Sequence, residues 1–221
     1  MAVMYAAGKG LAQVCFHTFG RFSVQGRENV PPRGRLLIVA NHQSNADPPA
    51  IAAAMPRKVH FVAKEALFKN PIAAWAMRAW GVHPLRRNGR DAEALLWMVH
   101  RLEQEQVIGI FPEGTRNPRG MGKASRGVAY VALKSHATIL PIGITGTERI
   151  KGFGRIPFPF CRLQVNIGQP FSLPPIDGKV SDSVLDSLTD MIMGRVADML
   201  PPEYRGVYGD AAGARARSRS A

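Results

Sequence analysis

Two short runs of consecutive apolar residues, LLIVA at 36–40 and VIGIF at 107–111, constrain the fold of this chain most strongly. Neither run alternates apolar with polar residues, which predicts strands that are buried on both faces. Further strands are expected at 58–63, at 137–144 and, half exposed, at 161–168. Because helical patterns separate these runs, the sequence predicts a single α/β domain whose mostly parallel, mixed sheet is flanked by helices.

The clearest helical pattern covers residues 90–106, where apolar side chains recur at spacings of three, four and seven residues. Other helices are expected at 1–20, at 48–55, on both sides of Pro71, at 126–136 and at 181–200.

The chain divides into three predicted parts. Residues 1–30 form an N-terminal amphipathic helix and an entry strand, and residues 31–200 form the main domain. From Pro201 onward the apolar pattern disappears, so residues 201–221 are expected to be a disordered basic tail. The helix at 1–20 either caps the globule or lies in a membrane interface with possible lipid contact, and the sequence leaves both interpretations open.

Charge limits the classes of partner. The chain has 29 Lys and Arg against 16 Asp and Glu, a formal net charge of +13, which attracts nucleic acid, anionic lipid or phosphorylated substrates. A nucleic-acid-binding protein is the main non-enzyme alternative, but no basic recognition helix appears, so no nucleic acid is expected.

No apolar run approaches the roughly 20 residues of a membrane span. Cys15 and Cys161 suggest no disulfide framework and therefore a reducing compartment.

Titratable side chains follow the strand at 36–40. His42 comes directly after Asn41, and Asp47 lies five residues beyond the histidine. A carboxylate that accepts a hydrogen bond from one imidazole nitrogen leaves the other nitrogen available to take a proton. The spacing alone fits equally simple structural roles, in which the histidine caps a strand and the aspartate caps a helix.

Polar and turn-forming residues also follow the strand at 107–111. The stretch FPEGTR supplies Glu113, Gly114, Thr115 and Arg116, and it predicts close backbone approach to a ligand and bidentate binding of a phosphate. A βα turn with a surface ion pair is the alternative. Two such strand exits in one domain favour a shared pocket, because ligands of open α/β sheets bind beyond the carboxyl ends of strands.

Two further features extend this predicted pocket. Arg86, Arg87 and Arg90 crowd one loop and are candidates for anion binding, although loop arginines are often merely solvated. Pro141 interrupts an apolar strand, which predicts an edge or a bulge that borders a groove.

Other chemistries fit the sequence poorly. GMGKAS at 120–125 departs from a P-loop at two positions, and the histidines and cysteines lack the spacing of a zinc site, so no metal is expected. Ser44 has no flanking glycines of a nucleophile elbow.

Four motifs in this order resemble the glycerolipid acyltransferases, most closely the 1-acylglycerol-3-phosphate type. They are H-x4-D at His42 and Asp47, K-x-x-L-x-x-x-P from Lys64, FPEGTR at 111–116 and ILPI at 139–142. The resemblance covers about half of the chain and makes residues 31–200 the acyltransferase domain, with a glycerolipid acyltransferase-like fold.

The resemblance also implies roles for the residues that match. His42 would be the general base on the acceptor hydroxyl, and Asp47 would orient it. The acceptor-phosphate site would include Glu113, Gly114 and Arg116, with Thr115 in the same motif. Lys64 and Arg87 would add to this site, and Arg86 is the alternative to Arg87.

The predicted activity is transfer of a fatty acyl group to the sn-2 hydroxyl of 1-acylglycerol-3-phosphate, giving phosphatidic acid. The donor would be acyl-CoA or acyl carrier protein, with no bound cofactor. Another lysophospholipid, glycerol-3-phosphate or an amino-lipid is the alternative acceptor. The basic surface and the weakly amphipathic N-terminus predict peripheral attachment to an anionic membrane surface, on the cytoplasmic face of the cell membrane.

Overall fold

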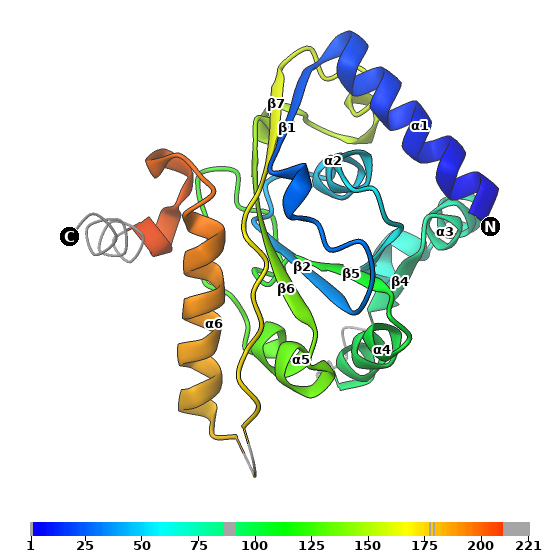
Figure 1. Ribbon diagram of the computed structural model, residues 1–221. Coiled ribbons are helices and arrows are strands. Elements are labelled where there is room, and N and C mark those ends of the chain that lie inside the picture. Colours follow the sequence, from blue (N-terminus) through cyan, green and yellow to red (C-terminus); the bar gives the residue numbers. More distant parts are fainter. Residues whose placement is uncertain (1, 86–91, 177, 179, 210–221) are drawn as a thin grey trace.

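The computed structural model describes residues 2–85, 92–176, 178 and 180–209 and forms a single α/β domain around a seven-stranded sheet (Figure 1). The strand order is β1-β7-β6-β2-β5-β3-β4. The strands are β1 (Arg21–Gln25), β2 (Leu36–Ala40), β3 (Val59–Lys64), β4 (Val82–Leu85), β5 (Val107–Ile110), β6 (Thr138–Thr145) and β7 (Arg162–Ile167). All pairings are parallel except that of β6 with β7, which confirms the predicted mixed, mostly parallel sheet.

Helices cover both faces of the sheet (Figure 1). They are α1 (Ala2–Phe19), α2 (Asp47–Ala54), α3 (Pro71–Ala79), α4 (Ala92–Glu103), α5 (Gly127–Ser135) and α6 (Asp182–Ala197). The side chains of Leu36 and Ile38 pack with α1 and α2, whereas those of Leu37 and Val39 pack with α4, α5 and α6. Alternate residues of β2 thus enter opposite cores, which explains why its sequence does not alternate.

Three differences from the expected elements have physical explanations. Strand β4 was not expected, because its four residues include a histidine and a proline and carry no apolar run. Pro141 does not mark a sheet edge, since β6 lies in the middle of the sheet between β7 and β2. The bulge interpretation fits better: residues 168–170 separate the end of β7 from the bridge that Ile139 makes with Phe171.

The C-terminal segment also differs in part. Residues 201–209 are not disordered: they form two short 3-10 helices at Pro202–Tyr204 and Gly206–Tyr208. Tyr208 is buried against α5 and α6, and its hydroxyl accepts a hydrogen bond from the Ala124 N–H at 3.1 Å. A single buried aromatic side chain produces no apolar periodicity, so the sequence does not indicate that this segment is packed. Residues 210–221 of the predicted tail lie outside the described residues.

The N-terminal helix packs on the domain through one face. Tyr5, Cys15 and Phe16 are buried, and Lys9 Nζ donates to the Met55 carbonyl at 2.6 Å. Among the helices within the described residues, none combines the length and hydropathy needed to cross a bilayer.

Candidate active site

The predicted site residues follow strands that end at one edge of the sheet. Because β6, β2, β5, β3 and β4 are neighbouring parallel strands, their carboxyl ends lie side by side. His42 follows β2, Glu113 to Arg116 follow β5, and Lys64 is the last residue of β3. Arg87, like its alternative Arg86, comes just after β4 but lies outside the described residues.

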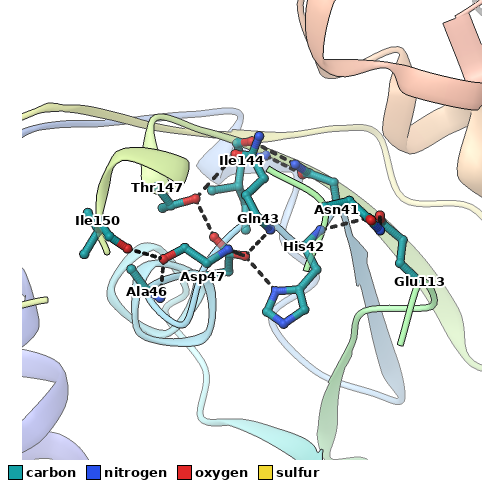
Figure 2. A network of polar contacts seen from close by, with 11 residues as sticks. Asn41, His42, Gln43, Ala46, Asp47, Glu113, Ile144, Thr147 and Ile150 are labelled. Carbon is teal, nitrogen blue, oxygen red and sulfur yellow. Dashed lines mark hydrogen bonds and ion pairs between the residues drawn. The ribbon is translucent and has the colours of Figure 1, made fainter. Parts of the chain in front are cut away.

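Asp47 is fully buried at the start of α2, and both of its carboxylate oxygens accept hydrogen bonds (Figure 2). Oδ2 accepts from His42 Nδ1 at 2.7 Å and from the backbone N–H groups of Gln43 and Ser44 at 2.6 and 2.8 Å. Oδ1 accepts from the Thr147 hydroxyl at 2.5 Å. A buried carboxylate with four donors is held in a single orientation.

The His42 ring is held in place on two sides. Its contact with Asp47 requires the proton on Nδ1, which leaves Nε2 as the basic nitrogen. The ring also stacks on Phe111, with 4.3 Å between the centroids and 23° between the planes. Its side chain is 18% exposed, and no described residue hydrogen-bonds to Nε2. One edge of the imidazole is therefore fixed, while the other is open to a proton donor.

Glu113 joins the loop after β5 to the loop after β2. Its Oε1 accepts from the His42 backbone N–H at 2.9 Å, and its Oε2 accepts from the Gly122 N–H at 2.7 Å and from the Asn117 amide. The Asn117 N–H in turn donates to the His42 carbonyl at 2.7 Å. Burial raises the pKa of the Glu113 carboxyl, and the hydrogen bonds from Gly122, Asn117 and His42 oppose that rise.

The last three residues of the FPEGTR motif are open to solvent. Gly114, Thr115 and Arg116 are exposed, and Gly114 has a φ of 64°, a left-handed conformation that glycine adopts without strain. The Gly114 N–H donates to the Phe111 carbonyl at 3.1 Å, which closes the turn. Within the part of the chain that the structure describes, the Arg116 side chain has no hydrogen-bond or ion-pair partner.

Two residues that complete the site were not predicted. Thr147 follows β6 and contacts Asp47 from 100 residues away in sequence. Asn41 joins the ends of β2 and β6, since its amide donates to the Ile144 carbonyl at 2.9 Å and accepts from the Ile144 N–H at 2.8 Å (Figure 2). Thr147 carries the same local signal as His42, a polar residue just past a buried strand.

Ser44 has a structural environment. Its hydroxyl donates to the Ile150 carbonyl at 3.0 Å and accepts from the Ala46 N–H at 3.3 Å, and the side chain is buried. Among the described residues, no three His, Cys, Asp or Glu side chains are grouped so that they could hold a metal ion.

Comparison with known families agrees with this geometry. A family model described as Acyltransferase matches residues 21–145, which include β1 to β6 and every predicted site residue. The chain belongs to the acyltransferase family. The resemblance inferred from the four motifs is thereby confirmed.

Several relatives of this chain are named 1-acyl-sn-glycerol-3-phosphate acyltransferases. The chain is 31% identical over 147 residues to 1-acyl-sn-glycerol-3-phosphate acyltransferase LPAT1, chloroplastic, of Arabidopsis thaliana, covering 65% of this chain and 41% of the relative. It is 28% identical over 158 residues to the 1-acyl-sn-glycerol-3-phosphate acyltransferase of Streptococcus pneumoniae, covering 71% and 57%. The chain thus spans about half the length of these curated relatives.

A solved structure supports the fold. The crystal structure of the 1-acyl-sn-glycerophosphate (LPA) acyltransferase PlsC from Thermotoga maritima matches with a TM-score of 0.68 and 27% identity. The match covers 85% of this chain and 76% of that one. The acyltransferase-like α/β fold expected from the sequence is therefore confirmed.

Proposed function

We propose that this protein transfers a fatty acyl group from an acyl thioester to the sn-2 hydroxyl of 1-acylglycerol-3-phosphate, forming phosphatidic acid. The observation that carries the proposal is the His42–Asp47 pair, with Nδ1 and Oδ2 2.7 Å apart and the basic Nε2 facing outward. The loop after β5 carries an exposed arginine, Arg116, that has no ion-pair partner in the described part of the chain. The names of the relatives support this choice of reaction and acceptor.

The reaction starts with general base catalysis. His42 Nε2 removes the proton of the acceptor hydroxyl as that oxygen attacks the thioester carbonyl carbon. The tetrahedral intermediate then collapses, and the carbon–sulfur bond breaks. The imidazolium returns its proton to the leaving thiolate, so the products are the ester and the free thiol. Because a thioester is already a reactive donor, no protein nucleophile is needed, in keeping with the hydrogen-bonded state of the Ser44 hydroxyl.

Negative charge develops on the carbonyl oxygen during attack and requires donors aimed at it. Backbone N–H groups near Gly114 are the candidates from sequence, but the N–H of Gly114 itself is engaged by Phe111. The following N–H groups, of Thr115 and Arg116, make no hydrogen bond to any residue that the structure describes. We assign the oxyanion to these two groups.

The acceptor phosphate is bound on the same edge of the sheet. Arg116 binds the phosphate, and Lys64, the last residue of β3, adds positive charge. Arg87, which follows β4 in sequence and lies outside the described residues, is proposed as a further cation of this site. Both carboxylate oxygens of Glu113 accept hydrogen bonds from backbone N–H groups, so its part in the phosphate site is to hold the loop that carries Gly114 and Arg116. Positioning of the hydroxyl against His42 is the main contribution of such a clamp.

The decisive experiment is a panel of acceptors given to the purified protein with acyl-CoA and, separately, with acyl carrier protein as donor. We expect turnover with 1-acylglycerol-3-phosphate and far less with monoacylglycerol, which lacks the phosphate. Equal rates for the two acceptors would contradict the phosphate site. Faster turnover of glycerol-3-phosphate or an amino-lipid would replace the proposed acceptor within the same chemistry. Since the acceptor is a membrane lipid, we place the protein peripherally at the cytoplasmic face of the cell membrane.

A further inference from the structure

Three phenylalanines from two distant segments form an exposed cluster beside the C-terminal end of α1. Phe19 makes edge-to-face contacts with Phe158 and Phe160, with ring centroids 4.9 and 5.7 Å apart. The three side chains, here called the aromatic cluster, are 37, 45 and 65% exposed. Large apolar groups gathered on a surface mark an interaction site more often than single exposed residues do.

The backbone is shaped to present this cluster. Phe160 has a φ of 45°, a left-handed conformation that is unfavourable for a bulky side chain and persists only where surrounding contacts enforce it. The enforcing contacts lie next to it: the Arg21 N–H donates to the Cys161 carbonyl at 3.1 Å, and a Cβ at Gly20 would lie 2.8 Å from Pro159. The connection between β6 and β7 is thus fastened to the end of α1 with its aromatic rings outward.

One arginine contacts the aromatic cluster, and two more, Arg21 and Arg162, follow Phe19 and Phe160 by two residues in sequence. The Arg155 guanidinium lies over the Phe160 ring, 5.6 Å from its centroid. Arg21 and Arg162 are paired across β1 and β7, and they line an open hollow of about 420 Å³ with Phe22 and Ser23. Two like charges directly opposite each other on adjacent strands repel, so a bound anion between them would stabilise the pair.

The two segments that form this surface are rich in cations, and the adjoining carboxylate, Glu148, is 17% exposed and pairs with Arg149 at 3.6 Å. Residues 1–27 contain no Asp or Glu, and residues 149–162 contain four Lys or Arg and no Asp or Glu. On α1, the solvent side also bears apolar side chains where a surface helix normally bears charges, since Val3, Leu11 and Val14 are 81, 64 and 62% exposed. The combination of exposed apolar side chains with a mainly cationic rim is that of an interfacial membrane surface.

We propose that the aromatic cluster, with Arg155 and the Arg21–Arg162 pair around it, docks this protein on an anionic phospholipid bilayer. The rings enter the boundary between head groups and acyl chains, and the arginines bind lipid phosphates. This inference deepens the proposed function, whose acceptor is a membrane lipid, and it assigns the contact to the β6–β7 connection together with α1. A second copy of the chain fits less well, because two such surfaces would bring like charges together.

The test measures binding of the full chain to vesicles by flotation, with phosphatidylcholine alone and with a phosphatidylcholine–phosphatidylglycerol mixture. The variant combines Phe158→Ser with Phe160→Asn, because asparagine accepts a left-handed conformation and the fold is retained. The matched control is Leu96→Ser, an exposed apolar side chain on α4 that is 59% exposed. A charge arm compares Arg155→Gln with Lys134→Gln, an exposed lysine on α5.

We expect wild-type protein to bind the anionic vesicles more tightly than the neutral ones. The double variant should lower the partition coefficient about tenfold or more, and Arg155→Gln should lower it about fivefold, with both controls unchanged. Equal binding by the double variant and wild type would overturn the proposal. A second outcome would also overturn it: the double variant binds vesicles like wild type but loses turnover only with acyl carrier protein as donor. The aromatic cluster would then bind an acidic protein and not a membrane.

The vesicle-binding test and the test of the proposed acyl transfer can fail independently of each other. Turnover of a short-chain, water-soluble acceptor should be the same in the double variant and the wild type. Absence of acyl transfer in both proteins would contradict the proposed reaction and leave the vesicle result standing. Normal transfer with unimpaired vesicle binding would contradict only the docking surface.

Discussion

The two halves of the candidate active site differ in how far their polar groups are already satisfied. In the catalytic half, formed by His42, Asp47 and Thr147, the carboxylate is fully buried and accepts four hydrogen bonds. In the open half, formed by Gly114, Thr115 and Arg116, the side chains are exposed and the arginine has no partner within the described residues. A group that must keep one geometry through the reaction is held by the protein, whereas a group that binds substrate is left for the substrate to satisfy.

The largest expected effect comes from the catalytic half. His42→Ala should lower kcat about a thousandfold, because a positioned general base typically contributes 10²- to 10⁴-fold. The melting temperature should change little, since Asp47 keeps its other three donors. The exposed His100 on α4 supplies the matched control, His100→Ala. Turnover by the His42 variant at the wild-type rate would remove the base assignment.

In the open half, Arg116→Ala should raise the KM for 1-acylglycerol-3-phosphate about tenfold or more, because a charge-assisted hydrogen bond to phosphate is lost. We expect kcat to fall much less, so steady-state kinetics will separate this half from the catalytic half. Arg119→Ala, three residues further along the same exposed loop, is the control. A KM that does not move would place the phosphate elsewhere.

Thr147→Val tests whether the catalytic half depends on contacts behind the histidine. The substitution keeps the shape but removes the hydroxyl that donates to Asp47 Oδ1, so Asp47 and His42 lose alignment. We expect kcat to fall about tenfold with an unchanged KM for the acceptor. Thr147→Ser should restore the rate, because it restores the donor. A serine variant as slow as the valine variant would mean that packing, and not the hydrogen bond, is what matters.

The smallest expected effect concerns Glu113, which links the two halves. Burial raises the pKa of this carboxyl, so its contribution to stability is present at low pH and is lost as the pH rises through the folded-state pKa. As the pH falls from 7 toward the ordinary carboxyl pKa of 4.5, the free energy of unfolding of wild type should increase relative to that of Glu113→Gln. Parallel denaturant titrations of both proteins measure this difference, and a difference of the opposite sign would contradict the shift.

The sequence predicted those site residues that directly follow a buried strand. His42, Asp47 and the FPEGTR residues were found because polar groups at the ends of buried runs share one edge of a parallel sheet. Thr147 obeys the same rule but contacts Asp47 across 100 residues of chain. Glu113 was expected in a phosphate site, and its bonds to the His42 and Gly122 N–H groups became visible only once the two loops were placed together.

The sequence by itself determined the α/β class, the positions of the buried strands along the chain and the identity of the histidine, aspartate and arginine at their ends. It could do so because burial, periodicity and short spacings are local properties of a chain. Only the tertiary structure decided that Thr147 supports Asp47, that Pro141 lies in the middle of the sheet, and that Phe19 meets Phe158 and Phe160. Those contacts depend on strand order and register, which are set by the packing of the whole domain.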